Sequence, residues 1–379
     1  MFEIQLKRLV KIYIPLTLAI IVLSSTIYHH LTIPIPSSVP LITFLTYDIL
    51  VVLFVAPLLY HCLKAMGTVP GLLFFFTVSF FVGGLEALWV FLGKLGILGD
   101  AYDYSMGGLW FLGIPFYIAL GWFIWVYVFY FLVKQLWPQA SSVKVACLCG
   151  LLALCIDIWM DPAVVNSSLV SDSPNVWNWA QTNAPKILTV PLYNFIGWFL
   201  TTATVVYVYE ISWARVKTIY QASHPFRQIF TRLAAGWIIF VVGTKIIQIA
   251  LDLLLPNLNL WPLGLDAGER LTVVKIALLV IVPVLIATCL VAAIRRALRE
   301  KESRKDIWLV LGFAAPLGVN LQMVYALQLA FPGTFLIYLV VFPLLLPLGM
   351  LWRYLTRPVQ TSAPDEVSSA IFDPERAAG

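Results

Sequence analysis

The sequence predicts an all-α fold, a polytopic bundle of about ten transmembrane helices with the N- and C-termini in the cytoplasm. Hydrophobic residues make up 61% of the 379-residue chain and charged residues only 11%, whereas soluble domains carry roughly 25% charged residues. Apolar runs of about 20 residues recur along the chain, and the mean hydropathy is +0.91. Basic residues are concentrated in alternate connecting segments, as the positive-inside rule requires of a protein with several spans.

Ten apolar runs define the expected spans. They lie near residues 9–30, 41–62, 71–93, 109–133, 145–160, 189–210, 233–254, 271–293, 307–329 and 335–352, and the fifth is short for a span. The first run is long and lacks a small-residue cleavage site, so we interpret it as a membrane span and not as a cleaved signal peptide. Residues 1–356 therefore form the predicted membrane domain, and residues 357–379 a polar cytoplasmic tail that we expect to be disordered.

The distribution of Lys and Arg determines the predicted orientation. With the N-terminus inside, the outer loops contain only Lys94, Lys186 and Arg270, and the inner segments contain nearly all the other basic residues. The most basic segment, residues 295–305, is expected to contact anionic lipid headgroups. Since these cytoplasmic segments account for the net charge of +5, we predict no nucleic-acid partner.

Histidines and cysteines do not predict a metal site in this chain. The four histidines, His29, His30, His61 and His224, exclude the membrane di-iron hydroxylases, which need a much larger histidine cluster. The five cysteines fall in or beside apolar runs, where buried thiols are the expected state.

Six ionisable residues lie inside the predicted spans, where charge is costly and is commonly functional. The topology places them in one layer in the outer half of the membrane, with Glu86 roughly 10 Å deep. Gly83 and Gly84, just before Glu86, allow close helix approach. Lys245 or Lys275 can pair with a carboxylate and fix helix packing. Glu86 and Asp157 have unusual neighbours and are candidates for function, and Glu210 is expected to be interfacial. The six residues are Asp48, Glu86, Asp157, Lys245, Asp252 and Lys275.

The stretch over residues 155–198 combines carboxylates, a proline, an asparagine and clustered tryptophans at a membrane boundary. Asp157 and Asp161 are four residues apart, so on a helix they share one face. Two interpretations fit this pattern: a helix stop followed by an interfacial aromatic belt, or a binding site. On the second interpretation, Asp157 and Asn194 face a pocket, while Asp161 and Pro162 shape its rim.

Several motifs of this chain occur, in the same order, in a known family. They are Glu86, Tyr102-Asp-Tyr104, Gly113-Ile-Pro115 at the opening of the fourth span, Asp157-Ile-Trp-Met-Asp161-Pro162, Trp177-Asn-Trp179, and Val190-Pro191-Leu-Tyr-Asn194-Phe195-Ile-Gly197-Trp198. Over about residues 80–215 they resemble the integral-membrane carotenoid biosynthesis family that includes the carotenoid 1,2-hydratases of the bisanhydrobacterioruberin hydratase type. The chain departs from the family pattern at Lys186-Ile-Leu-Thr, before the Val-Pro pair, and it continues through four further predicted spans.

The resemblance implies a lyase that adds water to the terminal C=C of an acyclic carotenoid end group without a cofactor. Protonation of this bond gives a tertiary carbocation, which water captures, and a carboxylic acid in an apolar setting can supply the proton. Glu86 and Asp157 are the candidate proton donors, with Asp161 in the same acidic motif, and Asn194 can position the water. The substrate-binding candidates, whose tryptophan faces can stabilise a cation, are Tyr102, Tyr104, Trp177, Trp179 and Trp198.

The implied partners are membrane lipid, a long apolar carotenoid, water and other enzymes of the same pathway. The implied location is a prokaryotic plasma membrane, with the protein crossing it several times. The reacting end group of such a substrate would meet the predicted layer of charge from within the bilayer.

Other functions share parts of this pattern. A carotenoid cyclase or isomerase would use the same protonation without water. A membrane prenyltransferase would bind a diphosphate through magnesium, but the Asp157–Asp161 pair has no second acidic motif beside it. A proton-coupled transporter or lipid-handling protein would also carry intramembrane charges. A retinal-binding protein could use Lys245 or Lys275, but the sequence shows no further signature of that class.

Overall fold

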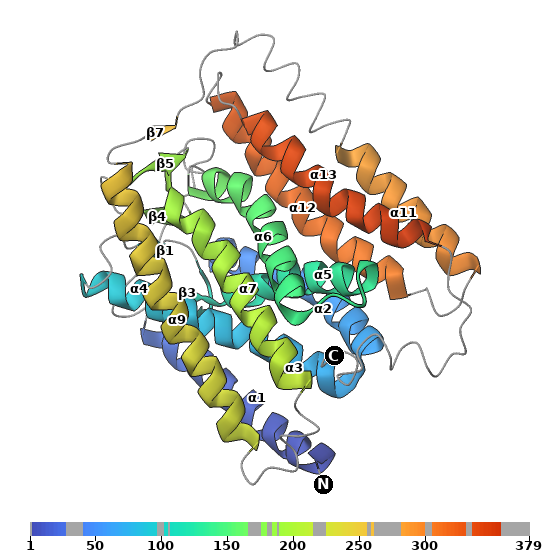
Figure 1. Cartoon of the computed structure of the whole chain (residues 1–379), viewed down its shortest axis with the longest axis horizontal. Helices are drawn as coiled ribbons and strands as arrows, with labels where there is room; N and C mark the ends of the chain where they lie inside the picture. Colours follow the sequence, from blue (N-terminus) through green and yellow to red (C-terminus); the bar gives the residue numbers. More distant parts are fainter. Residues whose placement is uncertain are drawn as a thin grey trace.

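The prediction of an all-α fold is confirmed by the computed structural model (Figure 1). It describes residues 2–27, 41–96, 102–104, 107–165, 176–179, 184–187, 189–214, 225–255, 259–260, 282–299, 305–330 and 336–357. The helical segments are α1 (Phe2–Ile27), α2 (Leu41–Met66), α3 (Thr68–Phe76), the π-helix η2 (Thr77–Val82), α4 (Gly83–Lys94), α5 (Phe116–Leu136), α6 (Ser142–Val165), α7 (Leu192–Ala214), α9 (Pro225–Leu254), α11 (Val282–Arg299), α12 (Lys305–Ala330) and α13 (Leu336–Thr356).

Each of the ten expected spans overlaps a helical segment, with α3, η2 and α4 forming one continuous segment. Within the described residues, five segments are long and apolar enough to cross a membrane: Leu45–Met66, Pro70–Lys94, Phe116–Leu136, Ser142–Val165 and Ala234–Leu254. The count of ten spans and the cytoplasmic termini stay predictions. The predicted tail beyond residue 357 lies outside the described residues.

Helix α5 forms the centre of the bundle, because it is buried along nearly its whole length. It contacts α2, η2, α6 and α13, and α6 packs along α7, which in turn packs against α9. Helices α11, α12 and α13 lie together on the side of the bundle away from α9 (Figure 1). The helices and strands that contain the predicted site motifs thus surround one aromatic-rich helix, α5.

Short strands connect the helices at the end of the bundle where these motifs lie. Strand β1 (Tyr102–Tyr104) pairs with β4 (Trp177–Trp179), and β2 (Trp110–Phe111) pairs with β3 (Ile114–Pro115), both antiparallel. Strand β5 (Lys186–Ile187) lies between β6 (Val190–Pro191) and β7 (Asn259–Leu260).

The predicted start of the fourth span was wrong, because the segment before α5 folds as a hairpin. Leu112 (φ 50°) and Gly113 (φ 92°) form its two-residue turn, and positive φ at both positions is the type I′ geometry of tight hairpins. Pro115 is the N-cap residue of α5 and has an extended backbone. Because a residue before proline avoids the helical conformation, Ile114 also stays outside the helix. The backbone N–H of Trp110 donates to Ser25 Oγ at 2.8 Å, which anchors the hairpin on α1.

Of the two interpretations of residues 155–198, a helix stop at Asp161 and Pro162 does not fit the structure. Helix α6 continues through Pro162 to Val165, so the fifth span has 24 residues and is not short. A proline close to a helix end removes one backbone hydrogen bond and leaves most of the helix intact. Both aspartates therefore stay on α6, where they share the face predicted from their spacing.

The charged residues of the predicted layer differ in burial and contacts, and their common depth in the membrane stays a prediction. Asp48 is buried and accepts hydrogen bonds from the backbone N–H groups of Gly108 and Leu109, both at 3.0 Å. Lys245 donates to Gln248 Oε1 on its own helix at 3.1 Å. Asp252 is exposed, because α9 lies at the edge of the bundle and its apolar segment is only 17% buried. Lys275 lies outside the described residues.

Glu210, predicted to be interfacial, is buried inside the protein at the opposite end of α7 from Asn194. Its carboxylate lies 3.3 Å from Lys134 Nζ and accepts a hydrogen bond from Tyr130 at 2.6 Å. Removing one partner of such a buried pair is strongly destabilising, so these contacts tie α7 to α5.

A second buried polar network ties the C-terminal helices to the rest of the bundle. His61 Nδ1 on α2 lies 2.6 Å from the hydroxyl of Tyr127 on α5, and its Nε2 lies 3.7 Å from Asp306 on α12. The hydroxyl of Tyr354 on α13 donates to Asp306 at 2.9 Å, and Arg296 Nε on α11 lies 3.5 Å from the same carboxylate. This network fixes α12 beside α2 and α5.

Candidate functional site

The tyrosine and tryptophan motifs meet as paired strands. Tyr102 lies opposite Trp179 in the β1–β4 pair, and Tyr104 lies opposite Trp177. The ring centroids are 4.5 Å apart in the first pair and 5.9 Å apart in the second. Cross-strand aromatic pairs stabilise short strand pairings, so the two motifs form one aromatic wall although they lie far apart in the sequence.

Glu86 is positioned by a local change in helix geometry. The π-helix η2 ends at Val82, directly before α4, and such π-turns are frequent at functional sites. Gly83 lies so close to α5 that an added Cβ would come within 2.8 Å of Ala119 Cβ, which confirms the predicted close approach at this position. The first turn of α4 therefore carries Glu86 to the aromatic wall.

Glu86 Oε1 accepts hydrogen bonds from both tyrosine hydroxyls of β1. Tyr104 donates at 2.8 Å, and Tyr102 donates to the same oxygen. Burial, followed by the charge of the nearby Glu86, raises the pKa of both tyrosines well above 10.0, so their hydroxyls stay protonated donors. One carboxyl oxygen has two lone pairs, so Oε1 can accept both hydrogen bonds at once and is held in place by both tyrosines.

The second acidic group is a pair of carboxyls on α6. Asn194 Nδ2, in the first turn of α7, donates to Asp157 Oδ2 at 3.2 Å and to Asp161 Oδ2. The other oxygen of each carboxyl, Oδ1, is buried without a hydrogen-bond partner among the described residues. Two ionised carboxylates held by one amide in an apolar setting repel each other, so the arrangement favours one proton on the pair.

Close helix packing holds this pair against Asn194. A Cβ added at Gly150, two turns before Asp157 on α6, would lie 2.7 Å from the backbone oxygen of Phe199 on α7. Only glycine permits this approach of the two backbones. The geometry of the acidic pair therefore depends on a contact outside the site itself.

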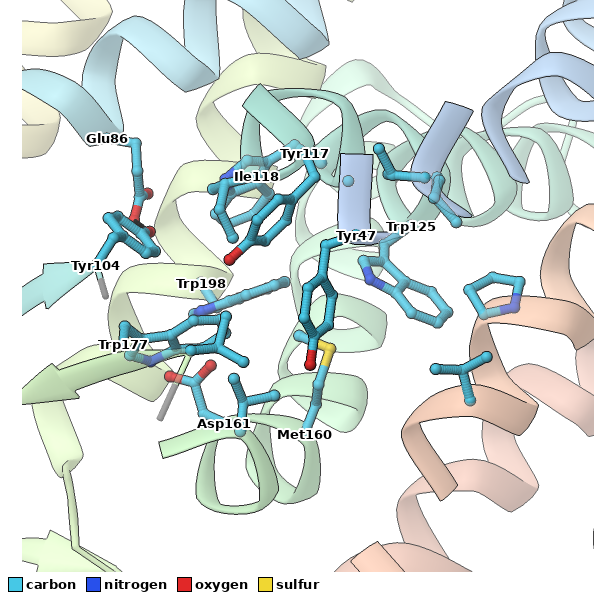
Figure 2. Close-up of a pocket in the computed structure, with 18 of the residues that line it drawn as sticks. Tyr47, Glu86, Tyr104, Tyr117, Ile118, Trp125, Met160, Asp161, Trp177 and Trp198 are labelled. Carbon is cyan, nitrogen blue, oxygen red and sulfur yellow. Dashed lines mark hydrogen bonds between the residues drawn. The ribbon is translucent and has the colours of Figure 1, made fainter. Parts of the chain in front are cut away.

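The two acidic groups face one cavity of about 170 Å³. Its polar lining includes Glu86, Tyr102, Tyr104, Asp161 and Asn194, and the hydroxyl-bearing Tyr47 and Tyr117 also line it. Figure 2 shows Glu86 and Tyr104 on one side of the cavity and Tyr47, Met160 and Trp125 on the other. The cavity thus has a polar end and an apolar, aromatic end, as expected for a ligand that is mostly hydrocarbon.

All nine predicted site residues lie at this cavity or directly behind it. Eight of them line it, and Asp157 is fully buried behind Asp161. Asn194 lines the cavity as predicted, but the prediction that Asp157 also faces it was wrong, and Asp161 belongs to the lining and not only to a rim. Trp198 stacks on Trp122 of α5 with ring centroids 4.2 Å apart.

Sequence reasoning missed a second set of cavity residues. Tyr117, Trp122 and Trp125 come from the aromatic run of α5, and Pro316 and Val319 come from α12. An aromatic run inside an apolar span could have suggested a ligand surface, but nothing in the sequence distinguishes the α12 residues from the rest of an apolar helix. Within the described part of the chain, no three His, Cys, Asp or Glu side chains are grouped to hold a metal ion.

Residues 46–260, more than half of the chain, match the model of the family described as "Carotenoid biosynthesis protein". The chain belongs to this carotenoid biosynthesis family. Neither the curated proteins nor the solved structures contain a significant match. Family membership gives the protein a place in carotenoid biosynthesis and suggests an enzyme, and the long apolar helices agree with a membrane protein.

The family match covers the chemistry-bearing part of the cavity but not all of it. Every predicted site residue lies within residues 46–260, whereas α12, with Pro316 and Val319, lies beyond them. In this carotenoid biosynthesis protein, the apolar end of the cavity is therefore completed by a segment outside the family match.

Proposed function

We propose that this protein is a membrane-bound carotenoid hydratase, which adds water across the terminal C=C of an acyclic carotenoid end group. The observation that carries the proposal is the pairing of two unlike acidic groups at the polar end of an aromatic cavity. Glu86 accepts two tyrosine hydrogen bonds, while Asp157 and Asp161 share the side-chain amide of Asn194. Different environments for neighbouring carboxyls are the usual basis of separate acid and base roles.

The proton donor in this proposal is Asp161. It lines the cavity, and Asp157 behind it completes the proton-sharing pair, with the amide of Asn194 orienting both. Transfer of the proton to the CH carbon of the terminal double bond forms a C–H bond and leaves a tertiary carbocation. This assignment moves the acid from Asp157, one of the two sequence-based candidates, to its neighbour one turn along α6.

Glu86 and the aromatic wall would then stabilise the cation. The carboxylate lies at the same end of the cavity as Asp161, and Trp177, Trp179 and Trp198 present ring surfaces there. Attraction between a cation and an aromatic face is worth about 2 kcal/mol or more when both are desolvated. Glu86 was the other candidate proton donor of the sequence analysis. In this proposal it acts instead as a base.

Water completes the reaction by forming a C–O bond to the cationic carbon. It loses one proton to Glu86, and exchange through water in the site returns this proton to the aspartate pair between turnovers. One water is added and no electron is transferred, so the proposed reaction needs no redox partner. The long polyene would extend from the apolar end of the cavity towards lipid, which supports an enzyme within a membrane; the membrane proposed is the plasma membrane of a prokaryote.

The test is the mass of the pigment made in a host that produces acyclic carotenoids. We expect wild-type protein to give a product heavier by one water. Asp161→Asn should lower the hydrated yield by about 10²- to 10⁴-fold, the usual contribution of a general acid, and Glu86→Gln should also lower it. Asp252→Asn, an exposed carboxyl on α9, is the matched control and should give wild-type yield.

Each outcome has a defined meaning. Wild-type hydration in Asp161→Asn, at equal protein level, would remove Asp161 as the acid. An unchanged pigment mass with altered absorbance in the wild type would instead indicate a cyclase or isomerase that uses the same protonation. Proton-dependent transport in vesicles with no change in pigment would favour a transporter.

A further inference from the structure

A second, smaller cavity of about 50 Å³ lies next to the first, between α4, α5, α7 and α9. The two cavities share five lining residues: Glu86, Tyr102, Trp122, Asn194 and Trp198. Glu86 and Asn194 therefore border both spaces. A molecule in the second cavity would lie beside the base and the amide of the proposed reaction.

The second cavity contains polar groups that the proposed chemistry has not yet used. Thr201 on α7 and Thr244 on α9 line it, and they are 6% and 2% exposed. Thr244 Oγ1 has no hydrogen-bond partner among the described residues. By contrast, the hydroxyl of Thr288 in α11 donates to the carbonyl one turn earlier at 2.6 Å, the common solution for a helical threonine.

A water molecule is the ligand that best fits these features. A buried hydroxyl without a partner is unfavourable, and buried waters bind where two to four polar groups converge. At roughly 10–15 Å³ for one water, the space suffices for a few waters but not for a carotenoid end group. Leu85, Trp89 and Phe240 supply apolar walls that isolate these polar groups.

We propose that this second cavity is the binding site for the reacting water, with Thr244 and Thr201 holding it beside Glu86 and Asn194. The inference rests on the proposed hydratase function. The bound water would cross the shared boundary to form the C–O bond to the carbocation, and its proton would pass to Glu86. Thr244 is a positioning residue in this scheme, because it acts on the water and not on the carotenoid.

The site makes a specific prediction about product partition. A carbocation that meets no water loses a proton from a neighbouring carbon and gives an isomer of unchanged mass. Thr244→Val removes the hydroxyl but keeps the shape, so we expect the ratio of hydrated to isomerised product to fall on the order of tenfold. Total substrate consumption should change much less, because the acid is intact.

Gly197 offers an independent way to block the same cavity. It lines the second cavity, and a Cβ added there would meet no heavy atom within 4 Å. Gly197→Leu should fill the space with hydrocarbon and shift the products in the same direction as Thr244→Val. Thr244→Ser, which restores the hydroxyl, should recover the wild-type ratio.

Thr202 provides the matched control on α7. It is fully buried, its Oγ1 also lacks a partner among the described residues, and it lines neither cavity. Thr202→Val should therefore keep the wild-type product ratio. This control separates loss of the water site from a general effect of removing a buried hydroxyl.

The experiment uses membranes containing the full chain, an acyclic carotenoid and ¹⁸O-labelled water, with labelled product and total substrate loss measured by mass spectrometry. Labelled product from the wild type, with a lowered ratio in Thr244→Val and Gly197→Leu only, supports the proposal. Wild-type ratios in both variants would overturn the water site and leave the hydratase function standing. No labelled product from the wild type would overturn the hydratase function, and the water site with it.

Discussion

Replacing Gly150 with alanine tests whether the packing of α6 against α7 holds the acidic pair in place. The added Cβ would lie 2.7 Å from Phe199 O, whereas ordinary contact begins at 3.4 Å, so the helices must separate by about 0.7 Å (3.4 − 2.7). The hydrogen bond from Asn194 Nδ2 to Asp157 Oδ2, now 3.2 Å, would lengthen to about 3.9 Å (3.2 + 0.7). At that distance it is no longer a hydrogen bond.

We expect two measurable effects of Gly150→Ala. Overpacking should lower the free energy of unfolding by about 1–3 kcal/mol, measured by thermal unfolding in detergent. The yield of hydrated carotenoid should fall about 10²-fold, since a misplacement near 1 Å can cost that much in catalysis. The yield is measured as pigment mass per amount of membrane protein.

Gly349→Ala in α13 is the control for this substitution. A Cβ there meets no heavy atom within 4 Å, so alanine should stabilise the helix by up to about 1 kcal/mol and leave the yield unchanged. Wild-type activity in Gly150→Ala would refute the idea that close packing of α6 and α7 positions the acidic pair.

Two further predictions concern the cavity and its tyrosines. A Cβ added at Gly121 would point into open space at the first cavity. Gly121→Leu should therefore block carotenoid binding and lower pigment conversion at least about tenfold, without lowering the melting temperature. Unchanged conversion would show that the substrate binds elsewhere. The double variant Tyr102→Phe/Tyr104→Phe removes both donors to Glu86 and should cost about 1.5–3 kcal/mol of stability per bond. Because the pKa of both tyrosines is raised in the folded protein above the unfolded value of 10.0, their stabilisation is complete below about pH 10 and is lost as the pH rises towards the folded values. The melting temperature of the wild type should therefore fall more steeply than that of the double variant above about pH 10, and parallel curves would contradict the pKa shifts.

Sequence patterns predicted the helices and the membership of the site better than its geometry. Apolar runs locate helices because each buries a continuous apolar surface, and the motif order was enough to group Glu86 with the tyrosine loop. The β1–β4 pairing could not be read, because two three-residue strands far apart in the sequence carry no periodic signal. Its register nevertheless decides which tyrosine meets which tryptophan.

The depth of the two aspartates shows a second limit. Asp157 and Asp161 share a helix face, so spacing alone assigns them equal access to a pocket. Which one lines the cavity depends on how α6 packs against α7, and that packing is set by Gly150, two turns away. The exposure of Asp252 shows a similar limit, because hydropathy does not report which face of α9 meets the bundle.

The wall that α12 adds to the cavity means that the binding site is encoded in two separate stretches of the gene. The stretch within residues 46–260 carries every acidic group of the site, while Pro316 and Val319 touch only the hydrocarbon end. If the proposed hydratase function holds, substitutions in α12 would change the length or branching of the polyene that fits without disturbing the residues proposed to transfer protons. Selection for a new substrate and selection for an intact reaction would act on different parts of this chain.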